Sequence, residues 1–128
     1  MEPGGLDVIG QVSRRVSDIE ASVAWFRDVL GLRHLYTFGP LAFFDCGGIR
    51  LYLTARGSGD PGADSVLYFQ VNDIESGYAD LVRRGVRFEQ PPRLVHRHED
   101  GVEEWMAFFT DPDGGLLALM SQTEPVAG

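Results

Sequence analysis

Hydrophobic and polar residues follow the same pattern in both halves of the chain. In the first half, an alternating run at 8–13 is followed by Asp18 and then by apolar residues three or four positions apart. In the second half, an alternating run at 66–71 is followed by Asp73 and a similar amphipathic stretch. Alternation indicates a strand with one buried face, and spacings of three and four indicate a helix. The repeated unit is therefore predicted to begin with a strand, an aspartate cap and a helix.

Both predicted helices have a polar start and a glycine end. The aspartates are good N-caps, because a carboxylate accepts hydrogen bonds from the unpaired amides of the first turn. Gly31 and Gly85 supply the left-handed conformation that commonly ends a helix. We expect the first helix to span about 19–30 and the second to run from Asp73 to about Arg84.

Short strand-like runs separated by glycine and proline follow each helix. The predicted strands are Arg33–Phe38, Leu41–Cys46 and Ile49–Thr54, then Val86–Glu89, Arg93–His98, Glu103–Thr110 and Leu116–Ser121. Two copies of such a long unit indicate a duplicated domain, because a solenoid needs at least three stacked repeats. We place the first module at about 7–54, a linker rich in glycine, serine and proline at 55–64, and the second module at about 65–121.

The composition fits one compact domain in the cytoplasm. The chain has 128 residues, of which 44% are hydrophobic and 23% charged, which is ordinary for a globular protein. No run approaches the roughly 18 apolar residues of a membrane span, and Met1–Gly5 lacks the pattern of a secretion signal. The single Cys46 excludes an intrachain disulfide. A net charge of −8 disfavours nucleic acid as a partner and mildly favours neutral or cationic ligands.

The residues described so far resemble the vicinal oxygen chelate superfamily, which includes glyoxalase I, extradiol dioxygenases, methylmalonyl-CoA epimerase and bleomycin-binding resistance proteins. The resemblance rests on Asp18-Ile19-Glu20 and Trp25-Phe26, on Asp111-Pro112-Asp113-Gly114 before a last apolar strand, and on the duplication. It implies an α+β fold of two tandem βαβββ modules whose curved mixed sheets enclose a cavity. It also implies a homodimer, which is common among members of this length.

In metal-using members of that superfamily, four His, Glu or Gln side chains bind a divalent ion that acts as a Lewis acid on the substrate. Counting from the motifs places these positions at Gln11, Tyr52, Val66 and Ala118. Only Gln11 could bind a metal, and one neutral amide oxygen is a poor anchor for a divalent cation. We therefore predict that this metal site is absent and that the protein has no cofactor.

His96 and His98 are the alternative candidates for a divalent metal. They alternate on a predicted strand, so their side chains would face one side and could act together with Glu103 or Glu104 of the next strand. However, they lie in a polar stretch that runs into a turn, where histidines are usually exposed to solvent.

Strand alternation also predicts a pocket lining that needs no metal. If Gln11 and Tyr52 face the cavity, residues at alternate positions face it too. These are Ser13, Arg50, Thr54, Val66, Tyr68, Gln70, Leu116, Ala118 and Met120. Trp105 and either Phe43 or Phe44 are candidates for stacking surface, with core packing as the alternative role. Such a mixture of aromatic, apolar and a few polar groups is typical of small-molecule pockets.

The sequence favours a metal-free small-molecule binding protein of the bleomycin-resistance type, which sequesters a hydrophobic or cationic compound. The predicted ligand-binding residues are Gln11, Ser13, Arg50, Tyr52, Tyr68, Trp105 and Met120. The alternative is a glyoxalase-like lyase, epimerase or dioxygenase that works without a metal or with an atypical site, such as Gln11 with His96 and His98. The sequence identifies no catalytic residue.

Overall fold

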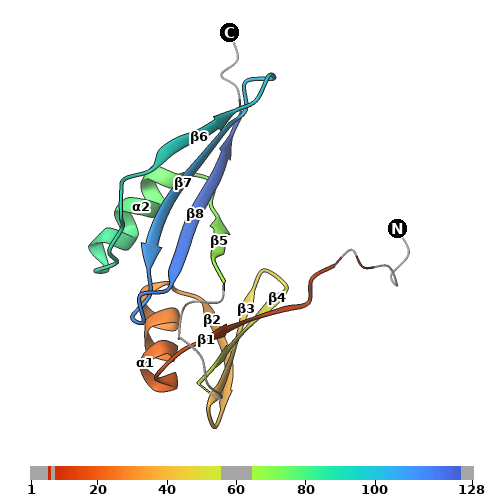
Figure 1. The fold of residues 1–128 in the computed structure, drawn as a ribbon, viewed down its shortest axis with the longest axis vertical. Helices are drawn as coiled ribbons and strands as arrows, with labels where there is room; N and C mark the ends of the chain where they lie inside the picture. Colours follow the sequence, from red (N-terminus) through yellow and green to blue (C-terminus); the bar gives the residue numbers. More distant parts are fainter. Residues whose placement is uncertain (1–5, 7, 56–64, 125–128) are drawn as a thin grey trace. The chain divides into compact units, whose positions relative to one another are not determined.

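The chain folds into two compact units, residues 1–64 (unit 1) and 65–128 (unit 2). The computed structural model describes residues 6, 8–55 and 65–124. Most of the expected linker, 56–64, lies outside the described residues. Each unit contains one helical segment and one four-stranded sheet (Figure 1).

Unit 1 contains β1 (Gln11–Arg15), α1 (Ile19–Ala24), the π-helical segment η1 (Trp25–Val29), β2 (Arg33–Phe38), β3 (Leu41–Cys46) and β4 (Ile49–Thr54). Its sheet has the order β1-β4-β3-β2. Strand β1 is parallel to β4, and the other neighbours are antiparallel.

Unit 2 contains β5 (Leu67–Gln70), α2 (Ile74–Arg83), β6 (Arg93–Arg97), β7 (Glu103–Thr110) and β8 (Leu116–Thr123). Its order, β5-β8-β7-β6, repeats that of unit 1, and β5 is again parallel to β8. The two βαβββ modules and the α+β fold class predicted from the sequence are therefore confirmed, as two open mixed sheets.

The helix starts follow the predicted capping. Oδ1 of Asp18 accepts a hydrogen bond from the backbone N–H of Ala21, and Oδ1 of Asp73 accepts one from that of Ser76, both at 3.1 Å. The glycine after the second helix, Gly85, has φ +90°, which side chains rarely adopt. Local chemistry thus sets where each helix begins and where the second one ends.

Three predicted elements differ substantially from the structure, while β5, β6 and β8 differ from their expected ranges by one or two residues at their ends. The first helix changes to π-helical geometry at its end, where the N–H of Leu30 bonds to the carbonyl of Trp25 at 3.1 Å. The first strand begins at Gln11 instead of residue 8. The segment Val86–Glu89 is not a strand, because only Phe88 forms a bridge, to Phe109. Two prolines that lack an N–H follow this segment and prevent it from extending the ladder.

One face of each sheet is buried beneath the helix of its own unit. In unit 1, Phe26 and Phe44 are fully buried, with ring centroids 6.1 Å apart. In unit 2, Phe109 and Leu117 are fully buried. A Cβ added to Gly77 of α2 would lie 3.4 Å from the Leu119 side chain, which shows how closely the helix approaches β8. The opposite face of each sheet, here called its open face, carries no helix of its own unit (Figure 1). None of the helices in the described ranges is long and apolar enough to cross a membrane.

Candidate functional site

The open face of unit 1 carries three aromatic rings in a continuous row, one from each of β2, β3 and β4. The centroids of Tyr36 and Phe43 are 4.7 Å apart with an interplanar angle of 30°. The rings of Phe43 and Tyr52 stack at 5.0 Å and 9°. The Arg50 guanidinium carbon lies 5.6 Å from the centroid of Phe43, within cation–π range. We call Tyr36, Phe43 and Tyr52 the aromatic row.

Polar side chains of β1 share this face. Gln11 lies opposite Arg50 and Ser13 opposite Tyr52 in the parallel register, and residues paired in this way point to one side of the sheet. Gln11 and Ser13 are both exposed. The structure therefore brings together four of the predicted ligand-binding residues on one surface.

The two candidate phenylalanines of β3 point in opposite directions. Phe43 belongs to the aromatic row, whereas Phe44 is fully buried against the helix of unit 1. Only Phe43 is thus available for stacking with a ligand. The sequence left these two residues as alternatives, because neighbouring strand positions exchange faces.

The residues at the four positions implied by the family resemblance do not fit a metal ion. Val66 and Ala118 have no donor atom in their side chains, and Ala118 is fully buried. The Tyr52 ring is stacked on Phe43. Across the described ranges, no group of three or more His, Cys, Asp or Glu side chains is arranged to hold a metal. Gln11 alone leaves too few ligands for a divalent cation at those positions.

The open face of unit 2 is formed by Tyr68, Ala118, Met120 and Phe108. Tyr68 pairs with Ala118 in the parallel register, and its ring contacts that of Phe108 edge to face at 5.9 Å. Tyr68 is 48% exposed, so its ring is accessible to a ligand. Met120 lies two positions from Ala118 on β8 and therefore shares its face.

The same open face carries a polar cluster at its β6 edge. His98 Nε2 lies 2.7 Å from Glu104 Oε2, and Gln122 Nε2 donates to the same oxygen at 3.3 Å. The His96 ring stands edge to face against that of His98, with centroids 4.5 Å apart. The hydrogen bond from His98, followed by that from Gln122, lowers the pKa of Glu104. Both histidines thus lie on the open face, and His98 forms a hydrogen-bonded pair with a carboxylate.

Trp105 lies on the opposite side of the unit 2 sheet from Tyr68 and Met120. It alternates along β7 with residues of the helix-covered face, Ala107 and Phe109. The structure therefore does not bring Trp105 together with the other predicted ligand-binding residues of unit 2.

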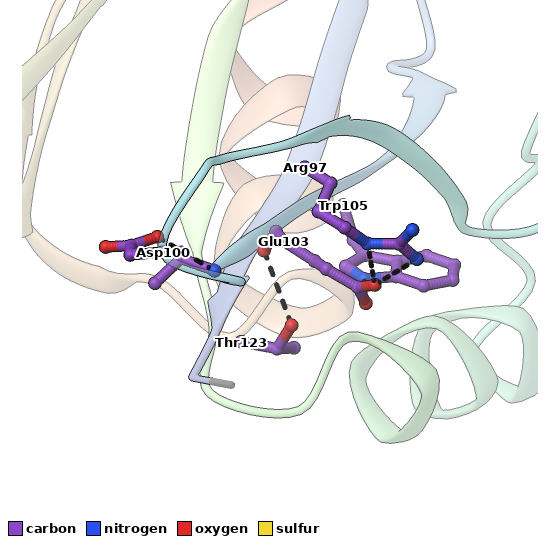
Figure 2. A network of polar contacts seen from close by, with 6 residues as sticks. Arg97, Asp100, Glu103, Trp105 and Thr123 are labelled. Carbon is purple, nitrogen blue, oxygen red and sulfur yellow. Dashed lines mark hydrogen bonds and ion pairs between the residues drawn. The ribbon is translucent and has the colours of Figure 1, made fainter. Parts of the chain in front are cut away.

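Trp105 instead borders a separate pocket of about 680 Å³ within unit 2. The pocket is lined by Asn72, Asp73, Ile74, Glu75, Gly101, Glu103, Trp105, Thr123 and Glu124. The Trp105 indole Nε1–H donates to Glu103 Oε1 at 3.2 Å, while Arg97 donates twice to Glu103 Oε2, at 2.6 and 2.8 Å (Figure 2). The hydrogen bonds from Arg97 and then Trp105 lower the pKa of Glu103.

The sequence reasoning missed this pocket. Its lining comes from the start of α2, the turn before β7 and the end of β8, and pairing between distant strands brings these segments together. One signal in the sequence could have indicated the position of Trp105. Trp105 is four positions from Phe109 on the same strand, so the two side chains share a face of the sheet, and Phe109, just before the Asp111 turn, is a core candidate.

The fold belongs to one class of proteins. Residues 8–119 match the Glyoxalase/Bleomycin resistance protein/Dioxygenase superfamily, and the chain belongs to this family. The family resemblance inferred from the motifs is therefore confirmed.

Individual proteins resemble this chain with modest sequence identity. The Bacillus subtilis (strain 168) protein described as "Uncharacterized protein YraH" is 28% identical over 127 residues, covering 85% of this chain and 94% of that protein. A lactoylglutathione lyase from Agrobacterium tumefaciens has a TM-score of 0.70 at 21% identity, covering 91% of this chain and 95% of the lyase. A putative glyoxalase family protein from Bacillus anthracis has a TM-score of 0.74 at 16% identity, covering 95% and 100%. Both solved structures share the fold.

Proposed function

We propose that this chain is a small-molecule binding protein that works without a metal ion and holds a planar hydrophobic compound against the aromatic row. The observation that carries the proposal is the continuous stack of Tyr36, Phe43 and Tyr52 on an open sheet face. Stacked rings offer a flat apolar surface of low conformational entropy, onto which another planar ring can pack. Tyr52 also stands at a position that the family resemblance assigns to a metal ligand, so aromatic surface replaces metal chemistry there.

The polar groups around the row would select the ligand. Ser13 and Gln11 lie beside Tyr52 and Arg50 in the register, and they offer hydroxyl and amide groups for directional hydrogen bonds. Arg50 places a positive charge above Phe43. This charge favours an uncharged or anionic compound on the row over a cationic one. The relatives support small-molecule binding only at the level of the family.

The test is a fluorescence titration with Nile red, a planar and uncharged dye whose emission rises in apolar surroundings. We expect saturable binding that is unchanged by EDTA and is weakened by Tyr52→Ala. Binding that requires an added divalent cation, or that is indifferent to Tyr52, would overturn the proposal.

A second candidate is a lyase or epimerase that transfers a proton without a metal. The observation that favours it is the His98–Glu104 pair on the open face of unit 2, with 2.7 Å between Nε2 and Oε2. A carboxylate that orients an imidazole is a common arrangement for a general base. His98→Ala and Glu104→Gln should each abolish solvent-deuterium exchange at an acidic C–H of a bound carbonyl compound. Equal exchange in wild type and both variants would exclude this candidate.

The proposal also includes a homodimer in the cytoplasm, with neither nucleic acid nor membrane as a partner. These expectations are supported by the family, by the net charge of −8 and by the composition. Sedimentation equilibrium would test the dimer, because a concentration-independent monomer mass contradicts it.

A further inference from the structure

The pocket beside Trp105 lies on the helix-covered side of the unit 2 sheet and is distinct from the aromatic row. Its volume of about 680 Å³ falls within the roughly 300–1,000 Å³ that is usual for small-molecule sites. All of its lining residues belong to unit 2. It therefore needs its own explanation.

The charged residues that line the pocket are all acidic. They are Asp73, Glu75, Glu103 and Glu124, and no Lys, Arg or His is among the described residues that line it. Arg97, whose side chain is mostly exposed, is not among the lining residues and is paired with Glu103. No described residue forms an ion pair with Glu75 or Glu124, and both are exposed. Two uncompensated carboxylates at the mouth of a pocket favour a positively charged occupant.

The start of α2 presents carboxylates to the pocket in place of free amides. Asp73 already caps the helix, because its Oδ1 accepts from the N–H of Ser76. Glu75 follows within the first turn. An anion would therefore meet negative charge at this helix start, even though helix starts often attract anions.

The indole of Trp105 is held in a fixed orientation at this site. Its N–H is bonded to Glu103, which is itself held by Arg97 (Figure 2). Because Glu103 fixes the edge of the indole that bears the nitrogen, the ring is positioned before any ligand arrives. The face of a tryptophan ring is the best natural partner for an organic cation.

A buried hydroxyl without a described hydrogen-bond partner lies on this side of the sheet, although Ser121 is not itself one of the residues that line the pocket. Ser121 lies directly opposite Trp105 in the β7–β8 register and two positions before Thr123, so it points to the same side as these two lining residues. Only 1% of Ser121 is exposed, and no described residue hydrogen-bonds its Oγ. Buried polar groups in folded proteins nearly always have a partner.

We infer that this pocket binds an organic cation, an amine or quaternary ammonium group attached to a small apolar or aromatic body. The cation packs against the face of Trp105, and Glu75 and Glu124 balance its charge. This site is separate from the aromatic row and does not depend on the function proposed for it.

The experiment compares three probes that share one ring and differ in charge: benzyltrimethylammonium, benzyl alcohol and benzenesulfonate. The chain has two tryptophans, so Trp25→Phe leaves Trp105 as the only indole. Its N–H signal can then be followed by heteronuclear NMR. We expect saturable shifts with the cation, much weaker binding of the alcohol and none of the sulfonate.

The matched variants replace carboxylates by isosteric amides. The double variant Glu75→Gln and Glu124→Gln should weaken cation binding by about tenfold, since each exposed ion pair raises the affinity by about threefold. Glu20→Gln with Glu99→Gln changes the net charge equally at exposed positions outside the pocket and should leave affinity within about twofold. Equal binding of all three probes, or equal losses in the two double variants, would overturn the inference. Tyr52→Ala should weaken Nile red binding and leave cation binding unchanged. The test of this pocket can therefore fail without affecting the test of the proposed function.

Discussion

Removing the Tyr52 ring should weaken binding of a planar hydrophobic compound while leaving the protein folded. The ring stacks on Phe43 at 5.0 Å with an interplanar angle of 9°, and a ligand stacked beside it would gain a similar contact. One aromatic pair contributes about 1 kcal/mol. If the ligand covers about 40 Å² of the ring, burial adds about 1 kcal/mol. The loss of about 2 kcal/mol predicts that Tyr52→Ala raises the Kd for Nile red by about thirtyfold.

Two further variants control this measurement. Tyr52→Phe keeps the ring and should bind the dye within about twofold of wild type, because stacking does not require the hydroxyl. Ile49→Ala removes an apolar side chain of unit 1 that is 37% exposed and alternates with Arg50 on β4, so it faces away from the aromatic row and its loss should have no effect. Circular dichroism would establish that each variant is folded. Wild-type affinity in Tyr52→Ala, or an equal loss in Ile49→Ala, would refute the reasoning.

Three other predictions concern stability and are measured by unfolding. Phe44→Ala, at a fully buried position, should lower the free energy of unfolding in urea by about 3–5 kcal/mol, and a loss below about 1 kcal/mol would contradict the described core. Asp73→Ala should lower the free energy of unfolding by about 1 kcal/mol because it removes the N-cap of α2. Asp73→Asn keeps a capping oxygen and should therefore retain most of the wild-type stability. Equal losses in the two variants would argue against capping. Arg97 lowers the pKa of Glu103 in the folded protein, so this carboxylate stabilises the fold above its unfolded pKa of about 4.3, and that stabilisation is lost as the pH falls through the folded pKa. The difference in thermal midpoint between wild type and Glu103→Gln should therefore shrink from pH 7 to pH 3, and a constant or widening difference would contradict this ion pair.

Much of the fold could be predicted because local signals mark its boundaries. Gly39-Pro40 and Gly47-Gly48 separate β2, β3 and β4, whose bounds agree with the predicted strands. The aspartate caps likewise mark both helix starts. Turn and cap residues act through their own backbone preferences, so a single sequence displays them directly.

Features that depend on distant partners were not visible in the sequence. The change to π-helical geometry at Trp25 carries no distinct residue pattern. Val86–Glu89 has the composition of a strand, yet only Phe88 finds a bridge partner. In such cases tertiary pairing overrides local propensity.

In the candidate site, too, some features can be predicted from the sequence and others depend on how the strands pair. A period of two predicts that Ser13 and Tyr52 share a face, and the parallel register places them side by side. The position of Tyr36 depends on an irregularity in the β2–β3 pairing between His34 and Tyr36, which sets its ring beside Phe43. Residue types alone do not reveal a bulge of this kind. The aromatic row therefore emerges only when the strands are paired.

The measurement that tests the central claim most directly is native mass spectrometry of the untagged protein, purified without added metal. The account predicts a metal-free protein that carries an organic adduct, with the adduct lost in Tyr52→Ala and retained in Tyr52→Phe. Stoichiometric zinc, nickel, manganese or iron would contradict the account, because it would require a metal site that Gln11, Tyr52, Val66 and Ala118 cannot form.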